Sequence, residues 1–510
     1  MTETTARIDE SPQARKPVKE FGLRSAFALS FADLSPIVGI YTVFAIGIVA
    51  AGPAFLWAFP LVLIGQLFVC GVFGNLASRW PLQGSVYAWS RELIGRRFGW
   101  LTGWAYMWGL TLAIVVLALA ASPYLLGAFG DNAPAQLTTE LVAVAILVFG
   151  TVVNLFGGRV LKTLIYIALA CELIASAGIG IALLVFHRVN SLSVIFSGGG
   201  TAHGPHWLIS AFLLPVAYIA YSFIGFEASA SVGEEVFDAH RAVPKALMLA
   251  LTSCGVLVIL AALGLELAIP DLPAVLSGKD TNPIATTLEQ SFGSAAGRVT
   301  LVMLVVGFAS SMIAVQTAVS RAIWASARDK ALPGGALLGR LSGREAMPRF
   351  AIGLTFVVAC VLVFFGTTKA FALLVSFASF GFILSYYLPI MGLAYRRLRR
   401  SIDLSGTWGE RWIGIVTAVA VVWLTAEIVN LVWPRAVYAD WYLNWGVLIM
   451  TGVLGVVGGL LCWRAFPGGS AAEASPAEAT AVIATAAEAT AVDAPTAQAP
   501  LPGAPAGESA

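Results

Sequence analysis

Long apolar stretches alternate with short polar connections along most of the chain. Twelve of these stretches reach the roughly 17–25 residues that an α-helix needs to cross the hydrocarbon layer of a bilayer. They lack the strict alternation of a membrane β-barrel, and only helices and closed barrels satisfy their backbone hydrogen bonds in lipid. The pattern therefore predicts an all-α integral membrane protein of twelve transmembrane helices. The predicted spans are 25–50, 54–78, 99–127, 139–157, 163–187, 208–230, 246–269, 299–320, 350–366, 370–394, 412–434 and 442–463.

The composition agrees with this prediction and argues against a soluble enzyme. Charged residues make up only 11% of the 510 residues, against about 25% in soluble domains, and hydrophobic residues make up 58%. The motifs H-E-x-x-H, G-x-x-x-x-G-K-[ST] and G-x-S-x-G are absent. The four histidines lie at or beyond the ends of spans, and the five cysteines lie inside apolar runs. We therefore expect no enzymatic activity, metal site, cofactor or nucleic-acid partner.

The distribution of basic residues predicts the orientation. If both termini are cytoplasmic, 25 of the 30 Lys and Arg residues fall in cytoplasmic segments, as the positive-inside rule requires. Residues 1–20 then form a polar cytoplasmic tail whose basic residues can meet anionic lipid headgroups. Residues 468–510 are rich in Ala, Glu and Pro and carry five acidic residues but no basic one. We expect them to form a disordered cytoplasmic tail of a multi-pass plasma-membrane protein.

The first predicted span carries an internal helix-breaking signal. Pro36 lacks a backbone N–H and disfavours helical geometry at Ser35, and Gly39 follows three residues later. Two half-helices joined by an unwound step fit this pattern, and a simple proline kink is the alternative. Asp33 precedes the break, where it is placed to hold the two half-helix ends together.

The sixth predicted span carries a second such signal. Gly225 lies close to Glu227, and a carboxylate inside a membrane is costly and therefore a functional-site hypothesis. The alternative is that Glu227 caps a helix or lies near the cytoplasmic interface. Spans one and six are the first members of two five-helix halves, and broken helices at corresponding positions point to a transporter's central site. At such breaks helix N-termini bind carboxylates, and free carbonyls bind ammonium groups or cations.

Other polar residues lie inside predicted spans. Glu172 in span five is either a proton relay or a buried, hydrogen-bonded structural residue. Glu427 in span eleven lies outside the two halves and is expected to be structural. Ser310 and Ser311 in span eight either lend hydroxyls to a cation or water site or hydrogen-bond back to their own helix.

Three groups of motifs resemble those of the amino acid–polyamine–organocation superfamily of secondary transporters. The resemblance covers about residues 21 to 400, and the motifs are specific when taken together. They are Gly52-Pro53 with R-x-P-x-x-G-S-x-Y at 79–87, F-I-G-F-E at 223–227 with R-A-V-P at 241–244, and S-R at 320–321 with A-R-D-K-A-L-P at 327–333.

The resemblance implies a leucine-transporter-type fold that works by alternating access. Its first inverted repeat would hold helices 1–5 at 21–187, and its second would hold helices 6–10 at 207–394. Helices 1 and 6 would be discontinuous, and two further helices would follow at 412–464. The implied substrate site lies against both breaks, at Ser35, Pro36, Ile37, Val38 and Gly39 and at Tyr221, Ser222, Phe223, Ile224, Gly225 and Phe226.

The resemblance also implies roles for single residues. Tyr221 would be an aromatic gate over the substrate, and its ring can attract an ammonium group. Glu227 would be linked to protonation and gating. Some proton-coupled members carry a Lys in span five, whereas this span has no interior Lys and carries Glu172 near that position. The S-P-x-x-G break resembles the amino acid/choline (GABA-permease-like) branch, which widens the substrate range to choline, γ-amino acids and polyamines.

These observations predict a secondary active transporter that imports an amino acid or related amine across the plasma membrane. We expect a proton as the coupling ion, carried by Glu227 and Glu172, with sodium as the other candidate. An exchanger of the same fold is an alternative, and a channel or substrate-sensing membrane protein is another from a different class. A channel should show a polar stripe repeated along several spans, whereas polarity here concentrates at two breaks.

Overall fold

The structure is a computed structural model, and its described part consists of helices and their connections. It describes Lys19 and residues 21–156, 167–199, 207–328, 332–342, 347–366, 370–435 and 440–466. The predicted tail 468–510 lies outside these residues, as does the predicted tail 1–20 apart from Lys19. Two isolated β-bridges occur, and the described residues contain no strand. The all-helical class is therefore confirmed.

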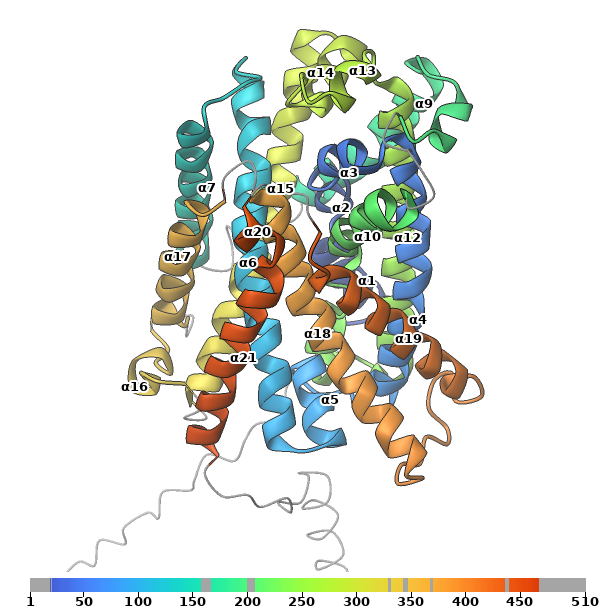
Figure 1. Cartoon of the computed structure of the whole chain (residues 1–510). Helices are drawn as coiled ribbons and strands as arrows, with labels where there is room; N and C mark the ends of the chain where they lie inside the picture. The colour runs from blue at the N-terminus through green and yellow to red at the C-terminus, as the bar shows by residue number, and fades with distance from the viewer. Residues whose placement is uncertain are drawn as a thin grey trace, which may run out of the picture. The chain divides into compact units, whose positions relative to one another are not determined.

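The long helices run along the bundle in Figure 1, and short helices connect or interrupt them. The helices of twelve or more residues are α1 Leu23–Leu34, α4 Ala58–Arg79, α6 Arg96–Ala128, α7 Gln136–Phe156, α12 Ala239–Ala268, α15 Ser294–Arg328, α17 Arg349–Val363, α18 Phe371–Leu398, α19 Ile413–Val432 and α21 Gly446–Ala465. The shorter ones are α2 Pro36–Tyr41, α3 Phe44–Ala51, η1 Pro53–Trp57, α5 Ser85–Leu93, η2 Ile174–Gly178, α9 Ile179–Phe186, η3 Leu192–Phe196, η4 Leu208–Phe212, α10 Leu213–Ile219, η5 Ala220–Phe223, α11 Ala228–Ser231, η6 Gly233–Glu235, α13 Leu272–Leu276, α14 Pro283–Phe292, α16 Gly335–Leu338 and α20 Trp441–Asn444.

Ten helices in the described residues are long and apolar enough to cross a membrane. Two predicted spans, 208–230 and 350–366, contain only the shorter apolar helices Leu213–Phe223 and Arg349–Val363. The first of these is short because the chain unwinds after Phe223. The multi-pass membrane architecture is confirmed, while the count of twelve and the inverted repeat stay predictions.

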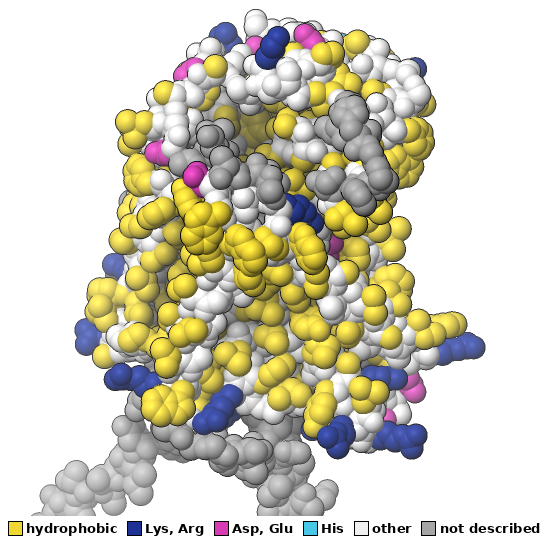
Figure 2. All heavy atoms as spheres, viewed as in Figure 1, with side chains coloured by type: hydrophobic (Ala, Val, Ile, Leu, Met, Phe, Trp, Pro, Cys, Tyr) yellow, Lys and Arg dark blue, Asp and Glu magenta, His cyan; other side chains and the backbone are white. Residues whose placement is uncertain are grey.

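The helices differ in how much of their apolar surface the bundle covers. In α6, 83% of the residues in the most apolar 18-residue stretch are buried, and this helix packs along α15 and α18. In the corresponding stretch of α21 only 22% of the residues are buried, so most of its apolar side chains face outward. A helix that is apolar all round suits the centre of a bundle or the lipid boundary. Figure 2 accordingly shows a largely apolar flank, with Lys and Arg gathered at the lower end.

Glycines allow neighbouring helices to approach closely. In α12, Gly264 lies directly against the backbone carbonyl of Gly180 in α9. A Cβ added to Gly180 would lie 2.9 Å from Cα of Ala261, so neither glycine has room for a methyl group. Such close backbone packing is how membrane helices gain van der Waals contact where lipid removes the hydrophobic driving force.

We expect the substitution Gly264→Ala to lower the free energy of unfolding by about 1–3 kcal/mol, because the added methyl group overlaps backbone atoms that cannot rotate away. The matched control is Gly455→Ala in α21, where nothing lies within 4 Å of the added Cβ. That variant should keep the stability or raise it by up to about 1 kcal/mol, since Ala is the better helix former. Thermal unfolding of both variants in detergent measures the difference, and equal midpoints would contradict this packing.

Candidate functional site

The first predicted span is interrupted at one residue. Helix α1 ends at Leu34, α2 begins at Pro36, and Ser35 between them has φ +46°. This backbone conformation is rare for a residue other than glycine. Pro36 accounts for the interruption of the helix at this residue, because proline disfavours helical geometry in the preceding residue but is well suited to begin a helix. The Ser35 hydroxyl then caps α2 by accepting a hydrogen bond from the Val38 N–H at 3.2 Å.

Glu172, from the helix Ile167–Phe186, lies at the N-terminus of α2. Its carboxylate accepts a short hydrogen bond from the Ser35 hydroxyl and a 2.9 Å bond from the Ile37 N–H. It lies just before the π-helical turn η2, where the Ser176 hydroxyl donates to its backbone carbonyl. A carboxylate is stabilised at this position by the free N–H groups and dipole of the half-helix. Of the two interpretations of Glu172, this geometry supports the buried, hydrogen-bonded one directly.

The second break follows η5. Ile224 is extended, and Gly225 has φ +95°, a conformation that favours glycine. A Cβ at Gly225 would lie 2.9 Å from Oδ2 of Asp33 and 3.2 Å from its backbone oxygen. A side chain at Gly225 would therefore push the two breaks apart.

Hydrogen bonds join the two interrupted spans directly. The Ser222 hydroxyl donates to the backbone oxygen of Gly39 at 2.5 Å. The Ser30 hydroxyl donates to the backbone oxygen of Phe226 at 2.7 Å and accepts from the Ser229 N–H at 3.1 Å. These bonds satisfy backbone groups that the broken helices leave without intrahelical partners. The two stretches proposed from the sequence are thus neighbours in space.

Glu227 is fully buried and is held by two tyrosines from other helices. Tyr106 of α6 donates to its Oε1 at 2.9 Å, and Tyr386 of α18 donates a short hydrogen bond to its Oε2. The Tyr386 hydroxyl also accepts from the Gly225 N–H at 3.0 Å. Glu227 occupies the N-cap position of α11, but its side chain does not cap that helix. Full burial places it within the bundle and not at a water interface.

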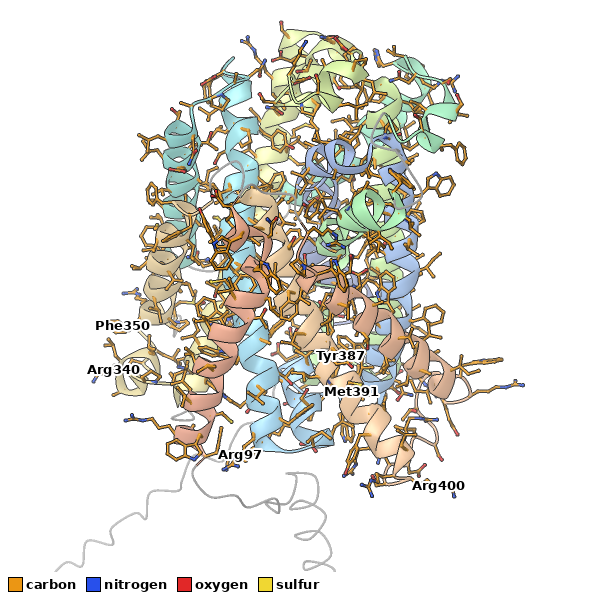
Figure 3. The ribbon with its side chains drawn as sticks, viewed as in Figure 1. Arg97, Arg340, Phe350, Tyr387, Met391 and Arg400 are labelled. Carbon is orange, nitrogen blue, oxygen red and sulfur yellow. The ribbon has the colours of Figure 1, made fainter. Side chains whose placement is uncertain are left out.

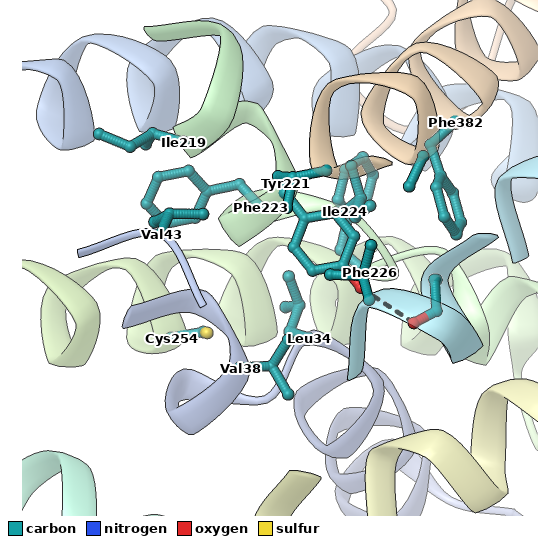
Figure 4. Close-up of a cluster of buried hydrophobic side chains, with 14 of the residues drawn as sticks. Leu34, Val38, Val43, Ile219, Tyr221, Phe223, Ile224, Phe226, Cys254 and Phe382 are labelled. Atoms are coloured by element: carbon teal, nitrogen blue, oxygen red, sulfur yellow. Dashed lines mark hydrogen bonds between the residues drawn. The ribbon is translucent and has the colours of Figure 1, made fainter. Parts of the chain in front are cut away.

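A cavity of about 30 Å³ lies between the two breaks. Figure 4 shows Leu34, Val38, Tyr221 and Ile224 gathered there, and all four line the cavity. Of the residues proposed from the sequence, those lining the cavity are Val38, Tyr221, Ile224, Gly225 and Ser311. Those outside its lining are Ser35, Pro36, Ile37, Gly39, Ser222, Phe223, Phe226, Glu172, Glu227 and Ser310.

Sequence reasoning missed several functional candidates. Tyr106 and Tyr386 are aromatic residues in apolar helices, and such residues usually only fill the core. The available signal was their hydroxyl group, because a buried Tyr hydroxyl normally finds a partner such as Glu227. Phe382 and Asp33 also line the cavity, although only Asp33 drew attention as a charged residue. Among the residues that the structure describes, no group of His, Cys, Asp or Glu is arranged to hold a metal ion.

A family model described as amino acid permease matches residues 21–457. The chain belongs to the amino acid permease family. Among similar proteins, amino-acid permease BAT1 of Arabidopsis thaliana is 26% identical over 82% of this chain and 86% of its own. Branched-chain amino acid permease BcaP of Lactococcus lactis subsp. cremoris is 24% identical over 69% of this chain and 77% of its own. The methylthioribose transporter of Bacillus subtilis is 27% identical over 61% of this chain and 68% of its own.

The family match confirms the resemblance to the amino acid–polyamine–organocation superfamily. It also confirms that this permease is a membrane transporter and not an enzyme. The roles of individual site residues, the direction of transport and the coupling ion stay predictions.

We expect the substitution Tyr386→Phe to destabilise the permease by about 1–3 kcal/mol, because it leaves the buried Glu227 carboxylate and Gly225 N–H with one partner fewer each. Tyr442→Phe in α20 is the control, since that ring is 52% exposed. The unfolding temperature of each variant in detergent measures the change in stability. If the two variants melt at the same temperature, the Tyr386 hydroxyl does not hold the second break.

Proposed function

We propose that this permease imports an amino acid or related amine across the plasma membrane by alternating access, driven by a proton. The observation that carries the proposal is the meeting of two interrupted helices at one cavity, with a buried carboxylate bonded to each break. Interrupted helices near the membrane midplane are the usual binding elements of secondary transporters. The names of the relatives BAT1 and BcaP favour an amino acid or a related compound as substrate.

The two breaks also support the proposed inverted repeat of 21–187 and 207–394. They fall in spans one and six, which are the corresponding first helices of the two proposed halves. Helices α19 and α21 would then be the two additional helices at 412–464. In the most apolar stretch of each helix only 33% and 22% of the residues are buried, so most side chains face outward, as expected of peripheral helices.

The positions of basic residues support an orientation with cytoplasmic termini. Arg97, Arg340 and Arg400 lie toward the same lower end of the bundle in Figure 3, away from the end formed by α13 and α14. The positive-inside rule assigns such an end to the cytoplasm. In this orientation the plasma-membrane permease would take up its substrate from the side of α13 and α14.

At the proposed cytoplasmic end, several hydrogen bonds join the ends of spans one, two and six. Phe21 forms two backbone hydrogen bonds with the end of η6 and the residues after it. Its N–H donates to the Glu235 oxygen at 3.1 Å, and its oxygen accepts from the Phe237 N–H at 2.8 Å. Gln83 donates to the carboxylates of Glu234 and Glu235 at 3.0 and 2.8 Å. Release of substrate to the cytoplasm would require these bonds between spans one, two and six to open.

Glu227 offers a means of coupling this opening to a proton. In the charged form its two carboxylate oxygens accept bonds from both Tyr106 and Tyr386. Protonation of one oxygen would add an O–H donor and make that oxygen a weaker acceptor, so the hydrogen bond from its tyrosine would weaken or rearrange. The hydrogen bonds that attach the second break to helices α6 and α18 would therefore depend on the protonation of Glu227. Glu172 would respond to a proton in the same way at the first break.

We expect Glu227→Gln to abolish the stimulation of uptake by an imposed pH gradient and to lower the uptake rate at least about tenfold. The amide cannot carry the titrating proton, and its NH₂ group cannot accept a bond from a tyrosine. Purified protein in proteoliposomes with an inward proton gradient, with and without sodium, provides the measurement. The control is Glu427→Gln, a buried carboxylate of α19 outside the cavity lining. An unchanged rate and pH dependence in Glu227→Gln would make the coupling assignment wrong.

A further inference from the structure

The cavity between the two breaks has the chemistry of a cation site. Asp33 is the charged residue of its lining, and no Lys, Arg or His contributes to that lining. The Asp33 carboxylate forms no hydrogen bond or ion pair with any other residue in the described part of the chain. Asp33 is partly buried, and a carboxylate without a partner inside an apolar bundle is costly, so a cation in the cavity would remove this penalty.

Aromatic rings strengthen this preference for a cation. Tyr221 and Phe382 line the same cavity as Asp33, and their ring faces attract ammonium groups by about 0.5–2 kcal/mol each. The remaining lining is mostly aliphatic, as in Leu34, Leu110 and Val315. An alkyl chain would fit this surface, whereas a second charged group would have no partner in it.

The start of α2 offers no free N–H group to a substrate carboxylate. At the start of α2, Pro36 has no N–H, the Ile37 N–H donates to Glu172, and the Val38 N–H donates to Ser35. The Gly39 N–H donates to the Ser35 backbone oxygen at 2.9 Å. At the second break, the Gly225 N–H donates to Tyr386. A carboxylate that bound these N–H groups would have to displace their present partners, and any carboxylate in the cavity would lie close to the Asp33 charge.

We propose that the substrate is an organic amine without a carboxylate, bound through its ammonium group by Asp33 and by the rings of Tyr221 and Phe382. This inference rests on the proposed transport function and narrows its substrate class. At about 30 Å³ the cavity has room for only a few water molecules, so the site must widen before such a substrate enters. The short bonds at the two breaks hold the site closed in its present form.

The first experiment compares compounds that differ in the carboxylate. Uptake into proteoliposomes is measured for choline against glycine betaine, isoamylamine against leucine, and phenethylamine against phenylalanine. We expect at least one amine to be transported with a kcat/KM at least about tenfold above that of its carboxylated partner. If the carboxylated member of every pair is transported equally well or better, or leucine exceeds all the amines, the inference is wrong and the transport function stands. If no compound is transported, the proposed function fails with it.

The second experiment tests Asp33 itself. Asp33→Asn keeps the shape of the side chain and removes its charge, so the KM of the preferred amine should rise at least about tenfold. Glu427→Gln removes a buried carboxylate elsewhere and should leave that KM unchanged. An unchanged KM in Asp33→Asn would overturn the assignment of the ammonium site. The comparison of compounds on the wild-type protein decides the substrate class even if this variant does not fold.

Discussion

The structure depends on satisfying backbone groups that two interrupted helices expose inside an apolar bundle. In lipid no water is available to replace a missing intrahelical hydrogen bond, so each such group needs a partner from the protein. At the first break Ser35 and Glu172 provide these partners, and at the second break Tyr386 bonds the Gly225 N–H. Ser222 and Ser30 accomplish the same across the space between the breaks. The polar residues of the core are therefore concentrated where the helices are broken.

This constraint also explains why the breaks must lie close together. A free carbonyl on one interrupted helix can be satisfied by a hydroxyl on the other only when their backbones nearly touch. Gly225 permits that approach because any side chain there would collide with Asp33. Gly39 contributes in the same way, since a Cβ would lie 3.2 Å from the Ser222 oxygen. The cavity is small because the same contacts that satisfy the backbone also draw the walls together.

The sequence predicted the positions of most helices and both interruptions, because apolar runs, proline and glycine act through their immediate neighbours. The interruption at Ser35 follows from Pro36, and the unwound Gly225 was recognisable beside Glu227. Partners from distant segments could not be predicted, since nothing local connects Glu172 to Ile37 or Tyr386 to Glu227. The length of each helix was also hard to read from hydropathy alone.

The choice between neighbouring residues required the structure as well. Ser310 and Ser311 have the same chemistry, but adjacent helical residues point about 100° apart, and only Ser311 lines the cavity. Similarly, the Ser35 hydroxyl bonds Glu172 and the Ile37 side chain lies against Gly307, whereas Val38 lines the cavity. Sequence reasoning identified two segments that meet at the cavity, and helix rotation decides which of their side chains line it.

The Tyr386 hydroxyl has a consequence for the kinetics of conformational change. It bonds both a side chain and a backbone N–H of the second break, and it belongs to the long helix α18. When α18 moves away, both bonds are lost in one event, and neither segment can relax gradually ahead of the other. In the proposed transport cycle, such a shared attachment would favour two discrete forms, closed and open, over a gradual opening. Partly opened forms with water leaking through the bundle would then be sparsely populated.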